Sequence, residues 1–184
     1  MLLLENENGT VRIELDEVYT VHSADNRHYD LILNPLSLSR EDFAKALAIH
    51  VGSLSKEFHA AIVGPGDISA SGCAILEQDI LTVMVGPTVV QIRITDCTVL
   101  RQANLLICGS TYAIHRVKKG YVIHGETEII MLDFSLAEKW RFAGEDVFVS
   151  VSGAPSFEIT ESGVHLRDFM DNAYVLDFDG NLIQ

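Results

Sequence analysis

The sequence predicts an α+β domain in which β-structure dominates: a mostly antiparallel sandwich or partly closed barrel with one main helix at about residues 39–59. Two observations carry this prediction. One stretch has apolar residues at helical spacing, and everything after residue 72 consists of short apolar segments with turn residues between them.

The helix is predicted from the stretch "SREDFAKALAIHVGSLSKEF", which begins at Ser39. Ser39 and Asp42 have the spacing of a capping box, and acidic residues in a first turn suit the helix dipole. Gly52 would weaken the middle of such a helix. The apolar side chains form one stripe at steps of 4, 4, 3 and 4, at Phe43, Leu47, Val51, Leu54 and Phe58.

The strands follow a loop at residues 63–72, which is rich in Gly, Pro and Ser. "CAILEQDILTVMV" contains two apolar runs, and "VVQIRIT" alternates apolar with polar residues. Similar segments continue to residue 166, and no internal repeat is evident among them. Connections this short predict antiparallel pairing, because parallel strands need long crossovers.

Length and charge bound the possible functions. A chain of 184 residues fits a single domain spanning 1–184. The formal net charge is −13, and residues 133–184 alone hold ten acids and three bases, a net charge of −7. Such a surface disfavours nucleic acid and anionic membranes, because both are bound mainly through Lys and Arg. It favours a protein partner or a homo-oligomer.

Cysteine usage and hydropathy bear on the cellular location. Cys73, Cys97 and Cys108 form no CxxC pair and lie in apolar runs, as free thiols do in reducing compartments. The chain has no segment typical of a signal peptide and no apolar run long enough for a membrane helix. We therefore expect a soluble, cytoplasmic protein.

A possible metal site comes from the stretch "STYAIHRVKKGYVIHGETE". If Lys119-Gly120 forms a two-residue hairpin loop, His115 lies directly opposite His124 on one face of the hairpin. Glu126 follows His124 by two positions and so shares that face. Two imidazoles and a carboxylate are typical ligands of a divalent metal, which is the one cofactor that the sequence suggests. The alternative is that both histidines are ordinary residues of a sheet face.

The segment "VLDFDGN" near the C-terminus resembles the nucleophile motif of haloacid-dehalogenase-like phosphatases. That resemblance implies Asp177 as nucleophile and Asp179 as general acid and base. The preceding sequence lacks the alternating strands and helices of those enzymes, whereas an Asp-Gly pair between apolar residues is a strong turn signal. We therefore expect a turn here, with Gly180 at a positive φ angle.

No catalytic constellation remains, so two classes of function stay open. The first is a non-enzymatic interaction or assembly protein, such as a component of a phage or other multi-subunit particle, or an acidic inhibitor of a basic toxin. The second is a small β-barrel metal-dependent enzyme or ligand-binding protein that uses His115, His124 and Glu126.

Overall fold

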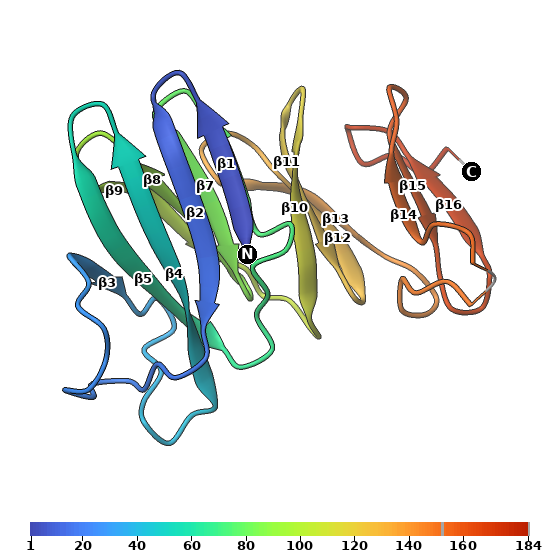
Figure 1. The fold of residues 1–184 in the computed structure, drawn as a ribbon. Helices are drawn as coiled ribbons and strands as arrows, with labels where there is room; N and C mark the ends of the chain where they lie inside the picture. The colour runs from blue at the N-terminus through green and yellow to red at the C-terminus, as the bar shows by residue number, and fades with distance from the viewer. Residues whose placement is uncertain (152, 184) are drawn as a thin grey trace. The chain divides into compact units, whose positions relative to one another are not determined.

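The computed structural model describes residues 1–151 and 153–183, and within these ranges it contains sixteen strands and no helix (Figure 1). The predicted α+β class is therefore wrong, and the protein is all-β with several antiparallel sheets. Over the same ranges, no helix is long and apolar enough to cross a membrane.

The chain divides into two compact units, Met1–Leu106 and Ile107–Gln184. The single domain spanning residues 1–184 stays a prediction.

The N-terminal unit contains two sheets. Sheet A has the strand order β1-β2-β4-β5-β3, and sheet B has the order β6-β7-β8-β9. All neighbouring strands are antiparallel except β3 and β5. The strands are β1 (Leu2–Asn6), β2 (Gly9–Asp16), β3 (Leu31–Leu33), β4 (Ala44–Ser53), β5 (Glu57–Pro65), β6 (Ala74–Glu77), β7 (Ile80–Val85), β8 (Thr88–Arg93) and β9 (Thr98–Asn104).

The predicted helix at residues 39–59 is a turn followed by β4, a second turn and the start of β5. The capping pair does form, because the Ser39 hydroxyl donates to the Asp42 carboxylate at 2.8 Å, but the chain then enters a strand. Two members of the apolar stripe, Phe43 and Leu54, are 79% and 86% exposed. The stripe therefore does not form a helix face.

Strand β4 is central in its sheet, and this position explains why its sequence imitates a helix. Leu47 and Ile49 face sheet B, whereas Ala46 and Ala48 face the loops around β3. A strand buried on both faces has a near-continuous apolar run instead of polar alternation. Leu47 and Val51 of the stripe belong to that run, whereas Phe43, Leu54 and Phe58 lie outside β4 and completed the helical spacing by chance.

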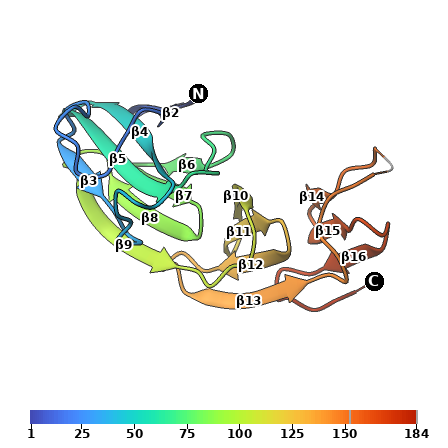
Figure 2. The same ribbon diagram turned by 90° about the horizontal axis from the view of Figure 1, so that it is seen from below.

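The C-terminal unit also contains two sheets, whose faces pack together. Sheet C has the order β10-β11-β12-β13, and sheet D has the order β14-β15-β16; Figure 2 shows the strands of sheet C in chain order. The shared core includes Val122, Ile129 and Met131 from sheet C with Val164, Leu166 and Leu176 from sheet D. The strands are β10 (Thr111–Val117), β11 (Gly120–Gly125), β12 (Glu128–Leu132), β13 (Glu138–Ala143), β14 (Phe157–Ile159), β15 (Val164–Arg167) and β16 (Ala173–Leu176).

Sheets C and D repeat one structural pattern, which the sequence analysis missed. Gly120 is the first residue of β11 and has a φ angle of 151°. Gly163 directly precedes β15 and has a φ angle of 153°. A Cβ atom at Gly120 would overlap the carbonyl oxygen of Leu132, and one at Gly163 would overlap that of Leu176. A glycine at the equivalent position of each sheet therefore allows two neighbouring strands to approach closely.

The turns that follow these strands also match. The Asp133 amide donates to the Ala137 carbonyl at 2.9 Å, and the Asp177 amide donates to the Asn181 carbonyl at 3.0 Å. The two aspartates are 177 − 133 = 44 residues apart. The fourth residue of each turn has a positive φ angle, 68° at Leu136 and 86° at Gly180. The two glycines are 163 − 120 = 43 residues apart, so sheets C and D share these local features at nearly the same spacing along the chain.

Candidate functional site

The β10–β11 hairpin positions the two histidines of the predicted metal site. Val117 pairs with Gly120, so the two-residue loop is Lys118-Lys119 and not Lys119-Gly120. His115 consequently pairs with Val122, and His124 pairs with Ala113. The loop lies one residue earlier than predicted, which shifts the pairing by two residues, because Gly120 is required for its close approach to β12 and not for the turn. The two histidines still share one sheet face, as diagonal neighbours.

Both imidazoles stack against one aromatic ring of sheet D. The Phe157 ring lies 4.8 Å from His115 and 4.2 Å from His124 between centroids, at interplanar angles of 27° and 12°. Tyr112 contacts His124 edge-on at 5.1 Å. The pair therefore belongs to an aromatic cluster between the two sheets of this unit.

The environment of the pair favours neutral imidazoles. Burial lowers the pKa of His124 to about 4, with a smaller contribution from the neighbouring His115, and burial also lowers the pKa of His115. Both Nε2 atoms are buried and have no hydrogen-bond partner among the described residues. Two neutral imidazole nitrogens are chemically able to ligate a metal, although Phe157 lies against both rings.

Glu126 lies in the β11–β12 loop, and its carboxylate is hydrogen-bonded to the backbone of Ser110. It accepts a hydrogen bond from the Ser110 amide at 3.2 Å, while the Glu126 amide donates to the Ser110 carbonyl at 2.8 Å. Among the residues that the structure describes, no group of three His, Cys, Asp or Glu side chains is arranged to hold a metal ion. The metal site stays a prediction. For Glu126 to act as a ligand, its carboxylate would have to break its hydrogen bond with the Ser110 amide.

The segment at Asp177 forms a turn, as predicted. The Asp177 carboxylate accepts the amides of Asp179 and Asn181 at 2.9 and 2.8 Å, and the Asn181 side chain at 2.8 Å. These hydrogen bonds lower the pKa of Asp177. Gly180 has φ 86°, and a Cβ there would lie 2.6 Å from the Trp140 ring. The carboxylate therefore serves the turn.

A second polar cluster, in the N-terminal unit, was missed by sequence reasoning. Asp16 is only 1% exposed and accepts a hydrogen bond from the Tyr29 hydroxyl at 2.6 Å. Arg27 lies 3.0 Å from Glu14 and 3.9 Å from Asp16, and His50 Nε2 lies 3.5 Å from Glu14. Burial, together with the hydrogen bond to Asp16, raises the pKa of Tyr29, so its hydroxyl acts as a donor.

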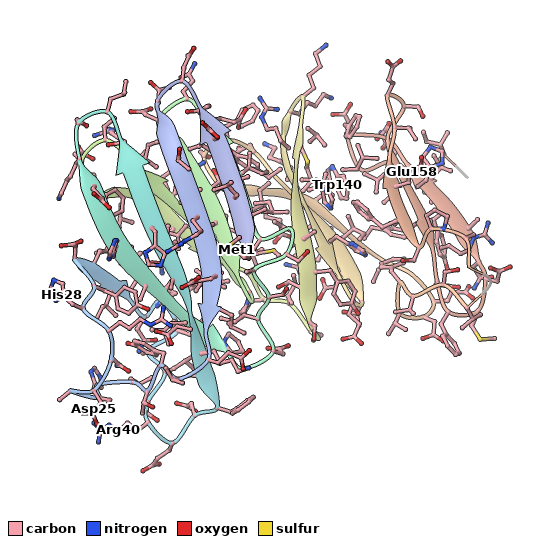
Figure 3. The ribbon with its side chains drawn as sticks, in the orientation of Figure 1. Met1, Asp25, His28, Arg40, Trp140 and Glu158 are labelled. Atoms are coloured by element: carbon pink, nitrogen blue, oxygen red, sulfur yellow. The ribbon has the colours of Figure 1, made fainter. Side chains whose placement is uncertain are left out.

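This cluster borders an open pocket of about 650 Å³ within the loops around β3. Tyr19, Tyr29 and Arg27 line it together with His22 and His28. Figure 3 shows His28, Asp25 and Arg40 on these loops, and Arg40 fixes them by donating to the Val21 carbonyl at 3.0 Å. No local spacing in the sequence indicates the cluster, because loop residues and the two strands β2 and β4 bring it together only in the fold.

No family model matches the chain, and a search of curated proteins finds no relative.

Proposed function

We propose that this protein is a non-enzymatic interaction protein that binds a basic protein partner. The observation that carries the proposal is the charge of the last part of the chain. Residues 145–184 contain eight acids and a single base, Arg167, a net charge of −7. The guanidinium of Arg167 lies 2.9 Å from the Asp171 carboxylate, so this base is already compensated.

The tandem arrangement of sheets C and D supports the same function. Repeated antiparallel sheets place equivalent loops at equivalent positions, and such loops often form a binding face. Charge of one sign on such loops attracts an oppositely charged partner and raises the rate of association. A component of a multi-subunit particle or an inhibitor of a basic toxin would use this chemistry.

The proposal is tested by affinity capture with the purified protein as bait, followed by native mass spectrometry of the complex. We expect capture of a basic protein that is lost at high salt, because ionic screening weakens exposed charge pairs. The matched bait carries Glu145→Gln and Asp171→Asn, which remove two exposed acids from the acidic segment and should weaken capture. A strictly monomeric protein without a partner, or capture unaffected by salt and by both substitutions, would contradict the proposal.

The second candidate remains a metal-dependent enzyme or ligand-binding protein, and one observation favours it. The Nε2 atoms of His115 and His124 are buried and have no hydrogen-bond partner in the described part of the chain. Metal analysis of the purified protein, compared with the His115→Ala, His124→Ala double variant, separates the candidates. Equal metal content in the two proteins would eliminate this site.

A further inference from the structure

One end of the C-terminal unit brings together the β11–β12 loop, the β15–β16 loop and the segment that links sheets C and D. The Phe148 amide donates to the Glu126 carbonyl at 2.7 Å, and the Phe169 amide donates to the Val147 carbonyl at 2.8 Å. The Glu145 amide also donates to the Tyr174 hydroxyl at 3.1 Å. The linking segment is therefore held between equivalent loops of the two sheets.

A buried carboxylate, that of Asp168, fixes the β15–β16 loop through hydrogen bonds. Asp168 is fully buried and accepts the Asn172 amide at 2.9 Å, the Asn172 side chain at 3.0 Å and the Tyr174 hydroxyl at 2.8 Å. Asp171 has a positive φ angle of 69°, and Gly180 has one of 86° in the related turn. A loop held in this way presents its side chains without a large ordering cost on binding.

The side chains presented at this end are apolar. Val149, Phe169 and Met170 are 39%, 48% and 66% exposed, and we call these three residues the loop-end patch. Glu145 and Asp171 lie beside it and are exposed. Exposed apolar groups with a polar rim are typical of interaction sites, and aromatic and Met side chains are enriched there.

We propose that the loop-end patch is the docking surface for a basic amphipathic segment of the partner, an inference that rests on the proposed function. The apolar side chains receive the apolar face of that segment, and the Glu145 carboxylate pairs with its Lys and Arg residues. Asp171 compensates the charge of Arg167 beside the patch, so the surroundings of the patch stay acidic. A second copy of this chain would bring like charges together, and an anionic membrane or nucleic acid would be repelled. A cationic protein segment satisfies both the apolar and the acidic features.

The test uses a synthetic amphipathic peptide of leucine and lysine, with its binding to the full chain measured by fluorescence anisotropy. Phe169→Ser and Met170→Ser should each weaken binding at least about tenfold, as for aromatic and apolar residues central to an interface. Leu54→Ser is the matched control, because Leu54 is 86% exposed in the N-terminal unit, and it should leave binding unchanged. Phe169→Leu should retain most of the affinity.

A second comparison tests the charge. Asp171→Asn should weaken binding more than Glu161→Gln, because Glu161 lies in the β14–β15 turn at the opposite end of β15. A peptide of leucine and glutamate with the same pattern should not bind; equal binding of both peptides would overturn the basic character of the partner. If the leucine and lysine peptide binds and neither serine variant weakens it, the docking surface is wrong but the proposed function stands. If that peptide does not bind the unaltered protein at all, the docking surface and the proposed function both fail.

Discussion

The buried imidazole of His124 should make the stability of the C-terminal unit depend on acid. Its pKa is about 4 in the folded chain and near the ordinary 6.5 when the chain unfolds. The unfolded state therefore binds a proton first, and stability is lost as the pH falls from 6.5 towards 4. At about 1.4 kcal/mol for each pH unit between the two values, the loss is at most about 3 kcal/mol.

The assay is urea unfolding of the protein at several pH values between 7 and 4, compared with His124→Phe. The phenylalanine ring preserves the stack on Phe157 and cannot be protonated, so the variant should lose about 3 kcal/mol less than the unaltered protein over this range. His28→Gln is the control for removal of a histidine outside this aromatic cluster, because the His28 side chain is 90% exposed. Equal losses in the unaltered protein and His124→Phe would refute the reasoning, as would a His124 pKa near 6.5 measured by NMR.

Further predictions concern the stability of the two units. Gly180→Val should lower the free energy of unfolding by about 2 kcal/mol or more, because a β-branched residue is strained at φ 86° and its Cβ would lie 2.6 Å from Trp140. Thermal unfolding of both variants is the measurement. Gly52→Ala is the matched control and should be neutral or stabilising, because nothing lies within 4 Å of a Cβ atom at that position. Asp16→Ala should cost about 2 kcal/mol in urea unfolding by leaving the buried Tyr29 hydroxyl without its acceptor; an unchanged midpoint would contradict that role.

The strands after residue 72 could be predicted from the sequence because turn residues separate apolar segments of strand length. The expected turn at Asp177 also formed, since its chemistry is local: one carboxylate accepts the amides of Asp179 and Asn181. The helix prediction failed where the fold overrides local spacing. Strand β4 is paired on both sides, with β2 and β5, and sequence spacing alone does not reveal this position.

The repeat could not be recognised from residue identity, because its defining features are geometric. The matching turns contain Leu136 in one sheet and Gly180 in the other, although both residues adopt a positive φ angle. The hairpin register failed for a related reason. Gly120 indicated a turn by its residue type, whereas the structure uses it where β11 approaches the Leu132 carbonyl.

The central claim is that the C-terminal unit binds a basic protein segment at the loop-end patch. NMR mapping of the amide signals during titration with the leucine and lysine peptide tests it most directly. We predict the largest shifts at Val149, Phe169, Met170 and the neighbouring Asp171, decreasing as salt is added. Shifts centred on the strands of sheets A and B, or no saturable shifts anywhere in the chain, would contradict the claim.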